Sequence, residues 1–174
     1  MTDPSRDSFM PQVTGEVLKD VGLFNDVSQE ALNRLAQELP CIKVELGKIV
    51  VQEGDESQLM YIVLGGELEV TKKRPDGHSV TVALLGPGDW FGEMSLLETF
   101  PRSATVRALA PSMLMVMTWD HVQTLLAAKD MDAYATLLLN ISRELSRRLR
   151  VADGLVAQFV STVSGVYAPA PRNK

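Results

Sequence analysis

The most informative stretch of this chain is residues 91–106, which read FGEMSLLETFPRSATV. Segments with the composition of β-strands flank it on both sides, so a plain connection there should be polar and exposed. It instead combines a glycine and several apolar residues with two opposite charges, Glu93 and Arg102, nine positions apart. This mixture indicates a loop that binds a ligand.

The residue types in this loop suit a nucleotide. Gly92 lets the backbone come close to a ligand, and residues 94–97 can form one helical turn whose free N–H groups favour an anion. Arg102 can grip a phosphate through two parallel hydrogen bonds, and Glu93 can accept from a sugar hydroxyl. One arginine and one helix end suit a singly charged phosphodiester better than a triphosphate, and no Walker loop is visible. A structural salt bridge between Glu93 and Arg102 is the alternative.

Outward from this loop, the chain changes from helical to β-rich and back to helical. From Gly15 to Pro40 the apolar spacing predicts helices, with Ser28 as the N-cap of the second. Short β-branched runs separated by turns follow between residues 42 and 118, which predicts a small antiparallel barrel or jelly roll. After Trp119 the helical period returns.

A long helix is predicted from about Met131 to Val163. Apolar or small residues recur along it at spacings that alternate between four and three positions. This pattern is typical of a helix that packs along a partner helix. The positions of this seam are Leu138, Ser142, Leu145, Leu149, Ala152, Val156, Phe159 and Val163. Packing of the seam against the chain's own barrel is the alternative. The arginines of this helix, Arg143, Arg147, Arg148 and Arg150, are interpreted as a solvated face.

Composition excludes several functional classes. The 17 basic and 22 acidic residues give a formal net charge of −5, without the basic excess of most nucleic-acid-binding domains. The single Cys41 excludes an internal disulfide and a cysteine-rich metal site, and two histidines make a histidine-built metal site improbable. No nucleophile–base pair is visible, so we expect no enzymatic activity. The polar N-terminus and the lack of a membrane-spanning apolar run predict a cytoplasmic protein.

The loop resembles the phosphate-binding cassette of the cyclic nucleotide-binding domain family. That cassette reads Phe-Gly-Glu, an apolar stretch, and then Pro-Arg-(Ala/Ser/Thr)-Ala-Thr, and the sequence matches it residue by residue. Gly54, Gly66 and the Gly-Pro-Gly-Asp turn at 86–89 support the match, which covers about residues 18–160. The resemblance implies an α+β fold, an antiparallel eight-stranded β-roll (a jelly-roll-like barrel) with N-terminal helices and a long C-terminal helix.

With this resemblance the chain divides into four parts. Residues 1–14 are expected to be a disordered N-terminus. Residues 15–127 are expected to form the cyclic nucleotide-binding β-roll with its N-terminal helices. Residues 128–163 would be the long C-terminal helix that serves as lid and dimerisation element, and residues 164–174 a flexible tail.

The resemblance also implies ligand contacts. Arg102 would pair with the cyclic phosphate, and Glu93 would accept from the ribose 2′-hydroxyl. The remaining contacts would come from the cassette and from one pocket wall: Phe91, Gly92, Met94, Ser95, Ser103 and Ala104, with Val82 and Ala83 in the wall.

The base contacts depart from the pattern of the catabolite-activator branch of the family. Residues 147–151 resemble its dimer helix just before the base contacts, so Ala152 and Asp153 would face the base. That branch has hydroxyl residues at these two positions. Asp153 can accept from the adenine amino group, or from the N1 and N2 hydrogens of guanine. The second of these contacts would favour cGMP. The expected ligand is cAMP, with cGMP as the alternative, and no other cofactor or metal is expected.

The expected function is a stand-alone, non-enzymatic cyclic nucleotide sensor, homodimeric through the long helix. Only 11 residues follow Val163, too few for a helix-turn-helix domain, so we expect no direct nucleic-acid binding and a signal passed to an unknown downstream protein. No membrane contact is expected. A ligand-free protein-interaction scaffold of the same fold is the alternative. A cupin-like metalloenzyme would need a cluster of histidines with a carboxylate, which the two histidines do not supply.

Overall fold

A computed structural model describes residues 13–98 and 100–166. The expected disordered N-terminus and flexible tail lie largely outside these residues. The elements follow one another as α1 (Gly15–Lys19), η1 (Gly22–Phe24), α2 (Gln29–Glu38), β1 (Cys41–Val44), β2 (Ile49–Val51), β3 (Leu59–Gly65), β4 (Leu68–Lys73), β5 (Ser79–Leu85), β6 (Trp90–Phe91), α3 (Glu93–Leu97), β7 (Thr105–Ala108), β8 (Ser112–Thr118), α4 (Trp119–His121), η2 (Val122–Ala127) and α5 (Met131–Val166).

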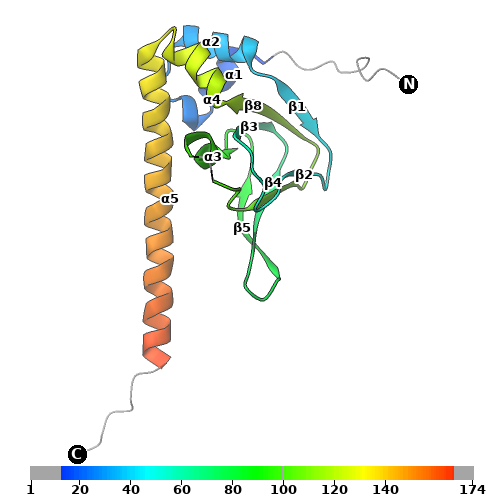
Figure 1. The fold of residues 1–174 in the computed structure, drawn as a ribbon, viewed down its shortest axis with the longest axis vertical. Coiled ribbons are helices and arrows are strands. Elements are labelled where there is room, and N and C mark those ends of the chain that lie inside the picture. Colours follow the sequence, from blue (N-terminus) through cyan, green and yellow to red (C-terminus); the bar gives the residue numbers. More distant parts are fainter. Residues whose placement is uncertain (1–12, 99, 167–174) are drawn as a thin grey trace, which may run out of the picture.

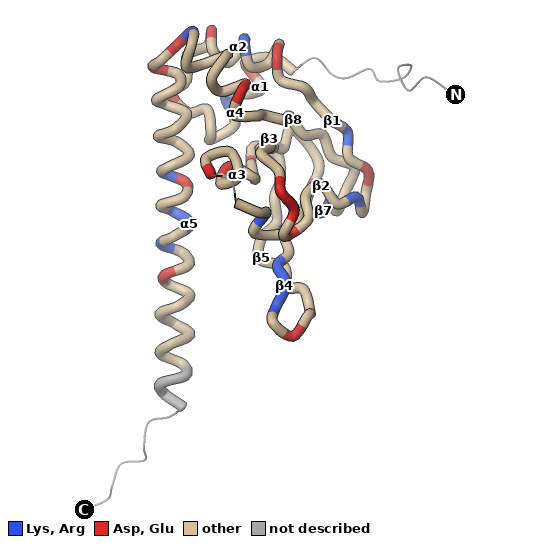
Figure 2. Tube along the Cα trace, in the orientation of Figure 1, with Lys and Arg blue, Asp and Glu red and all other residues tan. Residues whose placement is uncertain are grey.

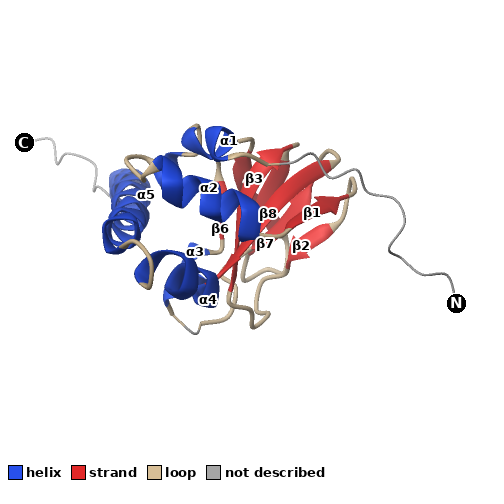
Figure 3. Ribbon diagram, turned by 90° about the horizontal axis from the view of Figure 1, so that it is seen from above, coloured by secondary structure: helices blue, strands red, loops and turns tan. Residues whose placement is uncertain are grey.

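The strands of the described residues form two antiparallel sheets of four strands each. Their orders are β1-β8-β3-β6 and β2-β7-β4-β5. Seen from above, the strands occupy one side of the molecule and the helices the other (Figure 3). The predicted eight-stranded roll with N-terminal helices and a long C-terminal helix is confirmed.

Strands β3 and β8 separate two hydrophobic cores. Successive residues of a strand point to opposite faces of the sheet. Met60 and Ile62 of β3 therefore pack with the helices, whereas Tyr61 and Val63 face the interior of the roll. Because both faces of these strands are buried, they read as continuous apolar runs rather than as alternating ones.

The N-terminal helices carry the predicted cap and hold the start of α5. The Ser28 hydroxyl accepts from the backbone N–H of Ala31 at 3.2 Å, which confirms Ser28 as the N-cap of α2. It also donates to the Asp130 carboxylate at 3.0 Å, and Asp130 in turn accepts from the backbone of Ala133 in the first turn of α5. One carboxylate thus caps α5 and joins it to α2.

The first turns of α5 pack on the body of the protein, and the turns that follow them are exposed. The buried Asn140 side chain donates to the carbonyl oxygens of Leu23 and Asn25 at 3.0 and 2.7 Å. From residue 146 to residue 162 every residue is exposed. Figure 1 shows this half of α5 standing apart from the roll. Within the described residues, no helix is both long and apolar enough to cross a membrane.

The turn between β6 and α3 depends on Gly92. Its φ is +85°, in the left-handed region that glycine adopts without strain. A side chain there would also collide, because a Cβ would lie 2.5 Å from Nη1 of Arg102 and 2.6 Å from the carbonyl oxygen of Leu59. Gly92 therefore permits both the turn and the close approach of Arg102.

Replacement of Gly92 by alanine is expected to destabilise the fold more than replacement of Gly77. Both glycines have nearly the same positive φ, +85° and +84°, but a Cβ at Gly77 meets nothing within 4 Å. Gly77→Ala should cost about 1–2 kcal/mol of unfolding free energy from backbone strain alone. Gly92→Ala should lose about 1–3 kcal/mol more from overpacking. Equal losses in denaturant unfolding would contradict the close packing of Arg102 under Gly92.

Candidate functional site

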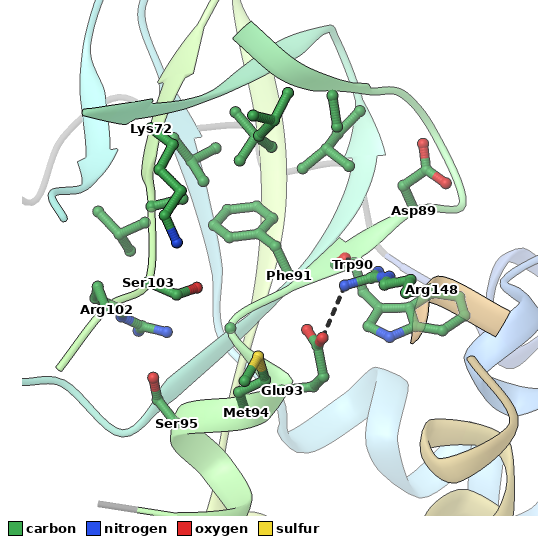
Figure 4. Close-up of a pocket in the computed structure, with 18 of the residues that line it drawn as sticks. Lys72, Asp89, Trp90, Phe91, Glu93, Met94, Ser95, Arg102, Ser103 and Arg148 are labelled. Carbon is green, nitrogen blue, oxygen red and sulfur yellow. Dashed lines mark hydrogen bonds and ion pairs between the residues drawn. The ribbon is translucent and has the colours of Figure 1, made fainter. Parts of the chain in front are cut away.

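A cavity of about 790 Å³ opens between the β4–β5 hairpin, the β6–α3 segment, the start of β7 and the middle of α5. Every predicted site residue of the cassette and of β5 lines it: Val82, Ala83, Phe91, Gly92, Glu93, Met94, Ser95, Arg102, Ser103 and Ala104. Figure 4 shows Arg102, Ser103 and Ser95 on one side of the cavity and Glu93 on the side nearer α5. The fold therefore gathers residues that are up to 22 positions apart in the sequence.

The Arg102 guanidinium is buried, and only one of its three nitrogens has hydrogen-bond partners among the described residues. The residue is 5% exposed. Its Nη2 donates to the carbonyl oxygen of Leu59 at 2.5 Å and to the Ser57 hydroxyl at 3.1 Å. Its Nε and Nη1 are buried and have no hydrogen-bond partner among the described residues. The guanidinium carbon lies 6.0 Å from the centre of the Tyr61 ring, within reach of a cation–π contact.

This arrangement favours an anion. Burial lowers the pKa of the Arg102 guanidinium, and the neighbouring Tyr61 and Glu93 act in the opposite direction. Leaving a buried charged donor unpaired costs about 1–3 kcal/mol or more. An oxyanion that accepts from Nε or Nη1 would reduce this cost through a charge-assisted hydrogen bond.

Glu93 is paired with α5 and not with Arg102. The residue is 3% exposed, and its Oε1 accepts from Nη1 of Arg148 at 2.8 Å. Arg148 also donates to the backbone oxygen of Trp90 at 3.4 Å. No ion pair joins Glu93 to Arg102 in the part of the chain that the structure describes. The structural salt bridge weighed as an alternative for these two residues is therefore not formed.

Glu144 holds two arginines at the cavity edge. Arg147 donates to it at 2.6 and 2.8 Å, and Nε of Arg148 donates to it at 2.8 Å. The hydrogen bonds from Arg147 are the largest cause that holds the pKa of Glu144 down at about 2. The interpretation of these arginines as a solvated face is thus wrong for Arg148, because this side chain reaches across to Glu93.

The structure does not bring Ala152 and Asp153 to the cavity. Glu144, Arg148 and Val151 line it and share one face of α5 at spacings of four and three. Successive residues turn by about 100° around a helix, so Ala152 and Asp153 lie off this face. Both are exposed. In this position of α5, the side chains of the helix that line the cavity are Glu144, Arg147, Arg148 and Val151.

Two residues that line the cavity, Arg148 and Lys72, were not predicted from the sequence, for different reasons. Arg148 is separated from Glu93 by 55 positions, and nothing local in the sequence indicates their contact. Lys72 could have been found, because the alternation that puts Leu68 and Val70 on the inner face of β4 continues to it.

Within residues 13–98 and 100–166, no three His, Cys, Asp or Glu side chains lie close enough to hold a metal ion.

Several proteins of known sequence are similar to this chain. A CRP-like cAMP-activated global transcriptional regulator of Mycobacterium tuberculosis is 27% identical over 84% of this chain and 63% of its own length. A cAMP-dependent protein kinase regulatory subunit of Yarrowia lipolytica is 41% identical over 63% of this chain and 28% of its own length. The Cyclic AMP receptor protein of Thermus thermophilus is 36% identical over 62% of this chain and 47% of its own length. The chain thus spans less than two thirds of these relatives.

Solved structures and a family model show the same similarity to proteins that contain cyclic nucleotide-binding domains. The Thermus thermophilus Catabolite Activator Protein matches with a TM-score of 0.71 and 30% identity, over 80% of this chain and 63% of that chain. A cyclic nucleotide-binding domain from Methylobacillus flagellatus matches with a TM-score of 0.72 and 28% identity, over 82% of this chain and 80% of that chain. The model of the cyclic nucleotide-binding domain matches residues 41–129, which include the whole cassette. This chain belongs to the cyclic nucleotide-binding domain family.

Proposed function

We propose that the protein is a non-enzymatic sensor that binds a cyclic nucleotide in this cavity, with cAMP as the first ligand to test and cGMP as the second. The observation that carries the proposal is the buried Arg102 guanidinium, whose Nε and Nη1 lack partners among the described residues. The names of two relatives, a cAMP-activated regulator and a cyclic AMP receptor protein, support the same ligand.

In this proposal each part of the ligand has a matching group. The cyclic phosphate accepts from Arg102, with Ser95, Ser103 and Ala104 around it. The ribose 2′-hydroxyl donates to Glu93. The base lies along the wall formed by Val82 and Ala83, on the side that faces α5. All of these residues line the one cavity.

Signalling would follow from the carboxylate that the ligand and α5 share. Glu93 is held by Arg148 from the exposed half of α5, at 2.8 Å. A ribose hydroxyl that donates to Glu93 changes this contact, so ligand affinity depends on where α5 lies. Ligand and α5 position are then linked, and binding shifts the population of helix positions.

We further propose that α5 forms a homodimer and that the signal passes to another protein. Three apolar residues of the predicted seam, Leu149, Val156 and Phe159, are 61%, 62% and 70% exposed and do not pack on the roll. An apolar stripe of this kind is stabilised when a second helix covers it. A formal net charge of −5 disfavours direct contact with nucleic acid.

The ligand test compares thermal unfolding of the wild type and Arg102→Ala with cAMP, cGMP and 5′-AMP. A ligand at 100 times its dissociation constant should stabilise the wild type by about 2.7 kcal/mol. Arg102→Ala should weaken binding by about 10- to 150-fold, because a charge-assisted hydrogen bond contributes about 1.5–3 kcal/mol. Arg150→Ala, an exposed arginine outside the cavity, should bind like the wild type. If millimolar cyclic nucleotide does not stabilise the wild type, the sensor proposal is wrong and the ligand-free interaction scaffold is the remaining hypothesis.

The dimer test is sedimentation velocity of the wild type, Phe159→Glu and Gln158→Glu. Phe159→Glu places a charge in the apolar stripe and should yield a monomer. Gln158→Glu adds the same charge at the neighbouring exposed position and should remain a dimer. A wild type that stays monomeric with and without ligand would contradict the proposed assembly.

A further inference from the structure

Lys72 is a cavity residue to which the cassette pattern assigns no part. It lies near the end of β4 and lines the same cavity as Arg102. Figure 4 shows its ammonium directed into the cavity, on the same side as Ser103 and Arg102. Figure 2 shows basic residues on β4 and in the middle of α5.

Strand pairing places Lys72 beside the phosphate-binding end of the cassette. On β4, Val70 pairs with Val106 and Thr71 with Thr105. The next residue, Lys72, therefore lies at the level of Ala104, where β7 leads back to Ser103 and Arg102. Residues two apart on a strand share a face, so Lys72 follows Val70 on the inner side of the sheet.

The cations of the cavity fall into two pairs. Arg147 and Arg148 are neutralised by Glu144 and Glu93. Arg102 and Lys72 form no ion pair with any described residue. The two unneutralised cations thus lie together at the cassette side of the cavity, and the two neutralised cations lie on α5.

We infer that Lys72 is a second cation of the phosphate cradle, which donates to the phosphate of the bound nucleotide alongside Arg102. This inference rests on the proposed function. An ammonium on a flexible stem can reach a phosphate oxygen as a point charge, whereas the Arg102 fork is fixed by Leu59 and Ser57. The phosphate is the part that cAMP and cGMP share, so Lys72 contributes affinity without selecting the base.

The test is calorimetric titration of cAMP and cGMP into the wild type, Lys72→Met, Lys72→Arg and Lys73→Met. Lys72→Met should weaken both nucleotides by the same factor, about tenfold, near the lower limit for a charge-assisted bond because Lys72 is exposed. Lys72→Arg should keep most of the affinity. Lys73→Met removes the same charge one residue along β4, outside the cavity, and should bind like the wild type.

Four results separate the inference from its alternatives. A loss for one nucleotide alone would place Lys72 at the base and overturn the inference. Unchanged affinity in Lys72→Met, or an equal loss in Lys73→Met, would show that Lys72 makes no specific contact with the phosphate. A wild type that binds neither nucleotide would instead overturn the proposed function itself, before Lys72 is tested.

Discussion

The buried guanidinium of Arg102 is the constraint on which the rest of the site depends. The fold satisfies its Nη2 with the carbonyl oxygen of Leu59 and the Ser57 hydroxyl and leaves Nε and Nη1 without partners among the described residues. Gly92 has no side chain to occupy the space beside Nη1. Tyr61, which stacks on Phe91 at 5.0 Å, forms the aromatic surface under the charge. An uncompensated cation in such a place is costly, so these features are best explained by an anion that completes the site.

A second feature joins this site to the long helix. The first turns of α5 are held by Asp130 and Asn140, and residues 146–162 of the helix are exposed. Arg148 provides the hydrogen bonds between this exposed half and the roll, through Glu93 and the backbone of Trp90. The carboxylate proposed for the ribose is therefore the same group that holds α5. In the proposed sensor, a ligand would therefore act on α5 directly through Glu93, without a separate relay.

Much of this could be predicted from the sequence because the signals are local. The cassette pattern, the strand runs between tight turns and the Ser28 cap each occupy a few adjacent residues, and all three agree with the structure. Strand β6 has only two residues, too few to show the period of a strand in the sequence. The contact of Arg148 with Glu93 depends on how α5 packs, which no local pattern encodes. The sequence placed the base contacts at Ala152 and Asp153, but the neighbouring residue Val151 is the one that lines the cavity. Adjacent helix residues point in different directions, so an error of one position changes which side chain faces the cavity.

The most direct test of the central claim is a crystal structure of the protein grown with a cyclic nucleotide. We expect a phosphate oxygen within hydrogen-bond distance, about 2.7–3.2 Å, of Nε or Nη1 of Arg102. The Leu59 and Ser57 contacts of Nη2 should remain in place. A nucleotide bound elsewhere in the cavity, with Nε and Nη1 still unpaired, would contradict the account.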